Sequence, residues 1–174
     1  LINHFFIVMP LKDMNGKLKQ SQRELAENET RLTRVIENTP VGIYFYDQTP
    51  DGLVLTHVNP AADTILGISH KDRLGKKITD AFPRLEGTPV PKAFETVLQS
   101  GEPWSSDDVT YSDYQISGAY HITAFRLSFG KMAVFFHDIT RRKQAESALQ
   151  ERETFIRETL NALTAHIVVI DKSG

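Results

Sequence analysis

Two groups of polar side chains in the second half of the chain are the strongest candidates for chemistry. Asp107, Asp108 and Asp113 form an acidic group on or beside a predicted strand. Paired carboxylates can act as general acid and base only beside a reacting group in a pocket, and no partner base accompanies these three. We therefore expect them to form a solvated surface. His121 is the second candidate, because an imidazole can donate or accept a hydrogen bond inside a cavity.

Sequence signatures of enzymes and metal sites are missing. The chain has no G-x-S-x-G, no glycine-rich phosphate loop and no H-E-x-x-H. His57, His70, His121 and His137 lack the close spacing of metal ligands. There is no cysteine, which removes disulfides, thiolate nucleophiles, zinc–thiolate sites and iron–sulfur clusters. We expect a segment that catalyses nothing by itself.

Length and composition indicate one globular domain with additional segments. The 174 residues are 40% hydrophobic and 24% charged, which is a globular composition. Twenty Lys and Arg residues against 22 Asp and Glu give a net charge of −2. The chain therefore has no basic field for a phosphate backbone, and we expect no nucleic-acid partner. The lack of cysteine fits a reducing compartment.

The strands expected to carry His121 are residues 104–112, 119–129 and 132–139, the last two joined by a tight turn at Gly130-Lys131. With a two- or four-residue loop, alternation places one set of side chains on a common face. This set is Met132, Val134, Phe136, Phe129, Leu127, Phe125, Thr123 and His121. Because it is mostly apolar, we expect it to face the core, with His121 and Thr123 as its polar members. The alternative is that His121 is a hydrogen-bonded structural residue near a strand end.

Turn and capping residues predict the elements before these strands. Residues 41–46 and 53–58 read as a hairpin around Pro50-Asp51-Gly52. Asn59 and Pro60 are expected to start a helix that ends at Gly67. Ser69 and Asp72 resemble a capping box that begins another short helix, which stops near Gly75. One more turn over 78–82 and a helix over 91–100 complete this part of the chain.

Heptad patterns predict long helices at both ends. Leu11, Leu18, Leu25 and Leu32 are seven residues apart, and Met14, Ser21, Asn28 and Val35 follow each by three. This a/d spacing favours a parallel dimeric coiled coil, and the alternative is one amphipathic helix packed on its own domain. After Thr140 the chain returns to helix, with Leu149, Ile156 and Leu163 again seven apart.

The two terminal segments suggest a piece of a longer protein. Residues 1–10 are mostly apolar but too short to cross a bilayer alone, so they are either the end of a transmembrane helix or a docked segment. A shift of 124 positions aligns Leu25, Glu29 and Asp47 with Leu149, Glu153 and Asp171. We therefore expect residues 153–174 to begin a second copy of the same module, with its first strand over 165–174.

Several stretches together resemble the PAS family of sensory domains with its C-terminal PAC portion. They are Pro40-Val41-Gly42-Ile43, Val58-Asn59-Pro60-Ala61-Ala62, Leu66-Gly67, Leu74-Gly75-Lys76, Gly101-Glu102-Pro103-Trp104 and Asp138-Ile139-Thr140-Arg141-Arg142-Lys143. The resemblance covers residues 31–145. It implies an α+β fold in which a five-stranded antiparallel sheet has short helices on one face, a pocket between them, and long signalling helices at both ends.

This resemblance sets the expected domain limits. We expect an apolar segment over 1–10, a coiled-coil signalling helix over 11–38, a PAS domain over 39–140, a linker helix over 141–164, and the first strand of a truncated second PAS domain over 165–174.

The resemblance also proposes a pocket for a noncovalent ligand of unknown identity. The expected lining residues are Tyr44, Tyr46, Phe94, Leu98, Trp104, His121, Thr123, Phe125, Val134 and Phe136. Core packing is the alternative role for the aromatic members. Flavin adducts and coumarate attach through cysteine in this family, so both are excluded as covalent chromophores. Haem-binding relatives use a histidine on the helix before the third strand, and residues 90–100 contain none.

The exit motif predicts a mechanical joint between sheet and helix. We expect Thr140 to cap the last helix and Asp138 to bridge to Arg142. The whole chain then reads as the sensory and dimerisation segment of a bacterial signal-transduction protein. The expected setting is a cytoplasmic two-component histidine kinase, with or without a tether to the inner membrane. Two alternatives are the sensor of a diguanylate cyclase or phosphodiesterase, and a ligand-free interaction and spacer module.

Overall fold

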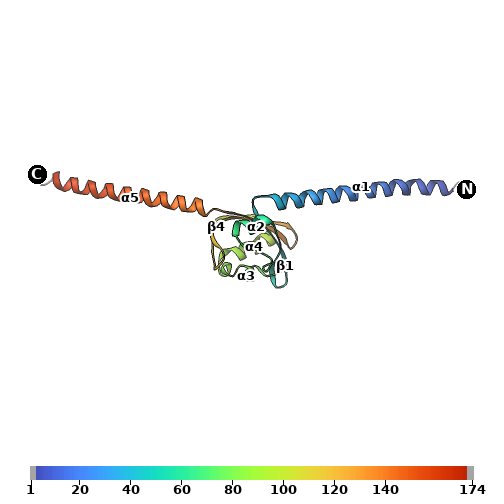
Figure 1. Ribbon diagram of the computed structural model, residues 1–174, viewed down its shortest axis with the longest axis horizontal. Helices are drawn as coiled ribbons and strands as arrows, with labels where there is room; N and C mark the ends of the chain where they lie inside the picture. The colour runs from blue at the N-terminus through green and yellow to red at the C-terminus, as the bar shows by residue number, and fades with distance from the viewer. Residues whose placement is uncertain (1–2, 172–174) are drawn as a thin grey trace.

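Five antiparallel strands form one sheet between two long terminal helices in the computed structural model (Figure 1). The structure describes the backbone of residues 3–171 and the side chains of residues 14–163. The sheet order is β2-β1-β5-β4-β3. The elements are α1 (Asn3–Asn38), β1 (Gly42–Thr49), β2 (Gly52–Val58), α2 (Pro60–Leu66), α3 (Ile78–Ala81), η1 (Pro83–Leu85), α4 (Pro89–Ser100), β3 (Trp104–Ser112), β4 (Ser117–Ser128), β5 (Lys131–Asp138) and α5 (Thr140–Asp171). The α+β fold expected from the sequence is confirmed.

Capping residues act at α2 largely as their types predict. The side chain of Asn59 accepts a hydrogen bond from the backbone N–H of Ala62, and Pro60 occupies the first helical position. Gly67 ends the helix at φ 66°, in the left-handed region that suits glycine. At α4 the helix begins two residues before the expected Pro91, with Thr88 as its cap.

The expected helix after Ser69 does not form. Residues 71–75 make a turn instead, held by bonds from the backbone N–H groups of Arg73 and Leu74 to the carbonyl of His70. The Ser69 hydroxyl reaches only the Lys71 N–H, at 3.5 Å, and no reciprocal bond from Asp72 is formed within the described residues. A single turn without that second cap does not propagate into a helix.

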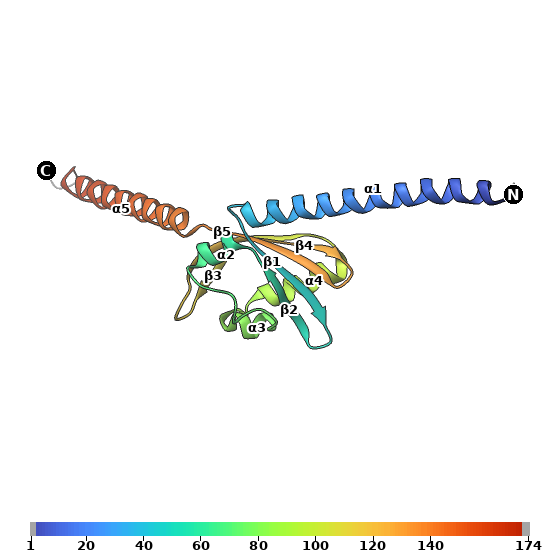
Figure 2. The ribbon, with the colours of Figure 1, turned by 45° about the vertical axis from the view of Figure 1, so that its right-hand side comes forward.

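The core lies between one face of the sheet and the short helices. Figure 2 shows α3 and α4 below the sheet, while α1 runs above it. From the sheet, buried Tyr46, Leu55 and Met132 point into this core, and Phe94 and Val97 of α4 meet them. The amphipathic spacing of Phe94, Val97 and Leu98 therefore places one face of α4 in the core, as the sequence predicts.

The two terminal helices extend away from the domain in opposite directions (Figure 1). Side chains 14–35 of α1 and 144–163 of α5 are exposed. The leucines of the α1 heptad are among them: Leu18 is 57% exposed and Leu25 60%. The intramolecular alternative, with α1 packed along its own domain, is therefore wrong for this part of the helix. The described backbone of the apolar 1–10 segment belongs to α1 from Asn3 onward, and residues 1–2 lie outside the described part.

The strand expected over 165–174 is wrong as far as Asp171, because α5 continues to that residue. Ten residues cannot supply the neighbouring strands to which a first strand bonds, whereas a helix pairs its backbone groups within itself. Residues 172–174 of that expected strand lie outside the described part.

Two features are absent from the described residues. No helix there combines the length and apolar character needed to span a bilayer. Nor do three or more His, Cys, Asp or Glu side chains in that part of the chain gather as metal ligands.

Candidate functional site

A cavity of about 60 Å³ lies between the inner face of the sheet and the helices. Its lining is almost wholly apolar or aromatic. The lining residues are Tyr44, Tyr46, Leu66, Phe82, Leu85, Val90, Phe94, Val109, Tyr111, Ile116, Tyr120, Ile122, Val134 and Phe136. Pockets for drug-sized ligands are roughly 300–1,000 Å³. The interior is therefore nearly filled by its own side chains.

Five of the expected lining residues do line this cavity, namely Tyr44, Tyr46, Phe94, Val134 and Phe136. Leu98 and Trp104 lie close by in the core without lining it. Trp104 packs edge-on against Phe94, with ring centroids 5.9 Å apart. These two residues shape the cavity indirectly, through the side chains that they support.

The expected inward face of β4 is wrong. The register pairs Ala124 with Val134 and Ile122 with Phe136, so even-numbered residues point inward and His121, Thr123 and Phe125 lie on the outer face. The cause is an irregularity between Arg126 and Ser128, where the register shifts by one residue. A bulge of one residue reverses the face of every side chain beyond it. No glycine or other local signal beside Leu127 predicts this bulge.

A chain of hydrogen bonds leads from the cavity wall toward the surface. The hydroxyl of Tyr44 lies 2.6 Å from Nε2 of His70, and Nδ1 of His70 lies 2.5 Å from the Asp63 carboxylate. His70 is only 2% exposed, and its burial lowers its pKa although its hydrogen bond to the Asp63 carboxylate acts in the opposite direction. The imidazole is therefore neutral: Nδ1–H donates to Asp63 and Nε2 accepts from Tyr44. Burial likewise raises the pKa of Tyr44 well above its ordinary value.

Asn59 connects this region to α1. Its amide NH₂ donates to the carbonyls of Ile36 and Val41, at 3.0 and 2.8 Å, and its carbonyl oxygen accepts from the Ile43 N–H at 2.8 Å. The capping role of Asn59 was predicted, but its bonds to Ile36 and Val41 were not. These contacts depend on tertiary proximity, which the local sequence does not encode.

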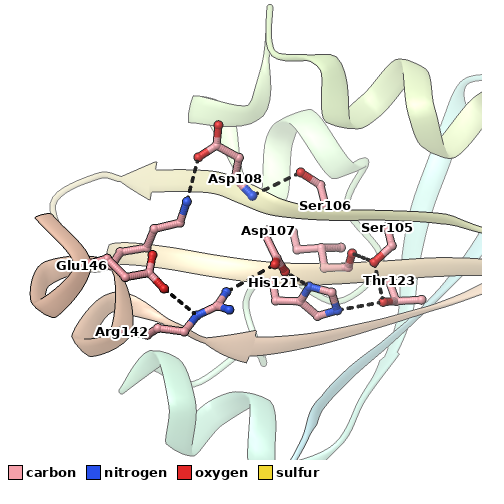
Figure 3. Close-up of polar contacts among 10 residues, drawn as sticks. Ser105, Ser106, Asp107, Asp108, His121, Thr123, Arg142 and Glu146 are labelled. Carbon is pink, nitrogen blue, oxygen red and sulfur yellow. Dashed lines mark hydrogen bonds and ion pairs between the residues drawn. The ribbon is translucent and has the colours of Figure 1, made fainter. Parts of the chain in front are cut away.

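The joint between the sheet and α5 has a different geometry from the one expected. The Asp138 carboxylate accepts from the Thr140 N–H at 2.8 Å, while the Thr140 hydroxyl accepts from the Ala119 N–H at 3.0 Å. Thr140 therefore extends the pairing with β4 and does not cap its own helix. The expected bridge from Asp138 to Arg142 is absent from the described contacts. Arg142 instead pairs with Asp107 at 3.4 Å (Figure 3).

The acidic group expected on a solvated face is largely paired. Asp107 bonds to Nδ1 of His121, and this bond together with Arg142 lowers the pKa of the Asp107 carboxyl. Asp108 pairs with Lys143 at 3.4 Å. Asp113 is buried in its own turn, where it accepts from the N–H groups of Gln115 and Ile116. None of these carboxylates lines the cavity.

Comparisons with known proteins agree with this geometry. A profile of the PAS fold family matches residues 30–131, more than half of the chain. The chain is also 27% identical over 164 residues to the sensor histidine kinase TmoS of Ectopseudomonas mendocina. That alignment covers 91% of this chain but only 15% of the kinase.

Solved structures share the fold at low sequence identity. An RNA-binding light-oxygen-voltage receptor matches with a TM-score of 0.60 and 15% identity, over 72% of this chain and 37% of the receptor. A domain of a sensory box sensor histidine kinase/response regulator from Geobacter sulfurreducens matches with a TM-score of 0.54 and 20% identity, over 66% of this chain and 96% of that domain. Together with the five-stranded sheet, the family match shows that the chain belongs to the PAS family.

Proposed function

We propose that this chain is the sensory and dimerisation segment of a cytoplasmic sensor histidine kinase in a two-component system. The observation that carries the proposal is a PAS fold whose two ends continue as long exposed helices. The alignment with TmoS supports the kinase over a cyclase or phosphodiesterase, although the chain spans only 15% of that relative. PAS domains are sensory and noncatalytic, so catalysis belongs to another part of the protein.

The proposed ligand is a small, mainly apolar molecule held without a covalent bond. A mostly apolar cavity of about 60 Å³ suits such an occupant. The Tyr44 hydroxyl already bonds to His70 and the Tyr111 hydroxyl to Asp113, so neither is free to bind a ligand. Anything beyond a few heavy atoms must displace side chains of the sheet or of α4. That displacement is the proposed stimulus.

The stimulus is proposed to reach the output through the joint at Asp138 and Thr140. Both side chains bond across the junction between β5, β4 and α5. A helix with two alternative packings needs only a modest bias to change its population. Substitution of Asp138 or Thr140 by Ala should therefore uncouple output while the domain stays folded.

A ligand-free spacer module is the second candidate, and the nearly filled interior is the observation that favours it. The two candidates differ in whether the cavity accepts an occupant. Xenon is a suitable probe, because it enters dry apolar cavities of this kind.

The test is a ¹H–¹⁵N NMR spectrum of the chain with and without dissolved xenon, alongside native mass spectrometry of the purified protein. We expect xenon to shift resonances of cavity residues, and Val90→Phe to abolish these shifts by filling the cavity. Val54→Phe, at a partly exposed position of β2 that does not line the cavity, is the matched control and should leave them unchanged. If xenon leaves the cavity resonances of the wild type unshifted and no small molecule copurifies, the sensor proposal is wrong and the spacer module is favoured.

Two finer assignments also belong to this proposal. Residues 138–143 are proposed to be the PAC exit motif, and residues 153–164 to be the helical start of a second PAS copy, without the first strand that α5 replaces as far as Asp171. The repeated heptad helix, which aligns Leu25 with Leu149 and Glu29 with Glu153, supports the second assignment.

A further inference from the structure

A bulge in the edge strand β3 places two carboxylates beside the start of α5. Ser106 pairs with Ile122 and Val109 with Tyr120, so Asp107 and Asp108 together face one residue of β4, His121. The hydroxyl of Ser106 accepts the Asp108 N–H at 3.2 Å, which holds the bulge in shape. Bulges redirect side chains in this way at sheet edges.

These carboxylates meet the basic residues of the first turn of α5. Asp107 pairs with Arg142 at 3.4 Å and Asp108 pairs with Lys143 at 3.4 Å, and Arg142 also lies 3.9 Å from Glu146 (Figure 3). The first turn of α5 contains no acidic residue. Cations at the positive end of a helix dipole are unfavourable, and an external carboxylate offsets that repulsion.

The contacts at the base of α5 include these ion pairs and the bond from the Ala119 N–H to the Thr140 hydroxyl. Side chains 144–163 are exposed, so the helix is fastened to the sheet through its first turn. At about 1.5 Å per residue the helix is about 48 Å long, and a tilt of about 10° at its base moves the far end by about 8 Å. A small change at these exposed and individually weak ion pairs therefore becomes a large displacement at the far end of the helix.

We propose that Asp107 and Asp108 are the positioning residues that set the direction of α5. Asp107 is held in turn by His121, whose Nε2 lies 3.2 Å from the Thr123 hydroxyl, which contacts Ser105 at 3.0 Å. Figure 3 shows these contacts as one polar chain along β3 and β4 that reaches Arg142 and, through it, Glu146. We call Asp107, Asp108, Arg142 and Lys143 the bulge clamp.

The bulge clamp lies next to the cavity along the chain. Val109 follows Asp108 and Ile122 follows His121, and both Val109 and Ile122 line the cavity. Because neighbouring residues of a strand point to opposite faces, movement of either side chain by an occupant shifts the backbone that carries the clamp. This link between cavity and clamp rests on the proposed sensory function. The positioning of α5 by the clamp does not.

The experiment measures where α5 points. The chain lacks cysteine, so Glu102→Cys in the domain and Gln150→Cys on α5 give two unique spin labels. Double electron–electron resonance measures the distribution of distances between the two spin labels. An excess of unlabelled protein suppresses signals between labels on different copies. We expect Asp107→Asn/Asp108→Asn to broaden this distribution at least about twofold, and about 1 M NaCl to broaden the wild type similarly.

Control variants separate the ion pairs from general disturbance. Asp51→Asn/Asp72→Asn removes the same charge far from α5 and should leave the distribution unchanged. Asp107→Arg/Arg142→Asp exchanges the two charges and should give a narrow distance distribution again. If Asp107 had only a structural role, this exchange would not restore the distribution. A distribution in Asp107→Asn/Asp108→Asn equal to that of the control pair overturns the bulge clamp. The measurement needs no ligand, so the clamp can fail while xenon binding still supports the sensor, and the reverse also holds.

Discussion

At the residue scale, the buried amide of Asn59 joins three elements of the domain. It bonds to the end of α1, the start of β1 and the first turn of α2. Asn59→Ala should lower the free energy of unfolding by about 3 kcal/mol, because buried backbone groups lose their partners. Urea unfolding followed by circular dichroism measures this. Asn38→Ala, which removes one exposed bond to Arg34, is the matched control and should cost less than about 0.5 kcal/mol. Equal losses in the two variants would contradict the role of Asn59.

His70 gives the domain a dependence on pH with a defined sign. Its pKa is lowered in the folded state, so the unfolded chain binds a proton more readily below the ordinary histidine pKa. The contribution of neutral His70 to the free energy of unfolding is complete above the ordinary histidine pKa. It is lost as the pH falls toward the lower pKa of His70 in the folded state. The free energy of unfolding of the wild type should therefore fall more between about pH 7 and about pH 5 than that of His70→Gln. Parallel urea titrations of both proteins test this, and identical slopes would show that His70 is not the group responsible.

At the element scale, packing of β1 against β5 depends on a glycine. A Cβ added at Gly42 would collide with the ring of Phe136. Gly42→Ala should lower the free energy of unfolding by about 1–3 kcal/mol, since an overpacked core must shift. Thermal unfolding measures the loss. Gly16→Ala is the matched control, because its Cβ would meet open space within α1. It should leave the domain's unfolding unchanged while raising helicity, and a loss as large as that of Gly42→Ala would refute the steric explanation.

Most elements could be predicted from the sequence because their signals are local. Asn59, Pro60 and Gly67 determine α2 within eight residues. The faces of β4 could not be predicted, because one bulge at Leu127 reverses every side chain between it and the start of the strand. Tyr44 and Phe136 lie outside the bulged strand and line the cavity as the sequence predicts, whereas the bulge puts His121 on the outer face. The sequence predicts a bridge from Arg142 to its near neighbour Asp138. The observed pair with Asp107 could not be predicted, because the position of the β3 bulge is a tertiary property.

At the scale of the whole molecule, the exposed heptad of α1 predicts self-association. Leu18, Leu25 and Leu32 remain uncovered in one chain, and a parallel coiled coil would bury them. Leu18→Lys/Leu25→Lys should weaken dimerisation at least about a hundredfold, because each lost leucine contact removes apolar burial at the interface. Analytical ultracentrifugation measures the dissociation constant. Gln20→Lys/Ala26→Lys adds the same charge outside the heptad positions and should preserve the dimer. A monomeric wild type at all concentrations would rule out this interface.

The described ion pairs between α5 and the sheet end at Lys143, and the side chains of residues 144–163 are exposed. A gene fusion made just beyond that residue would keep the native fastening of the helix, whatever sequence follows. Exchange of the downstream part in steps of seven residues would preserve the phase of the helix, while other step lengths would rotate it. Recombination at this boundary is therefore a simple route by which such a domain could be transferred between unrelated effectors.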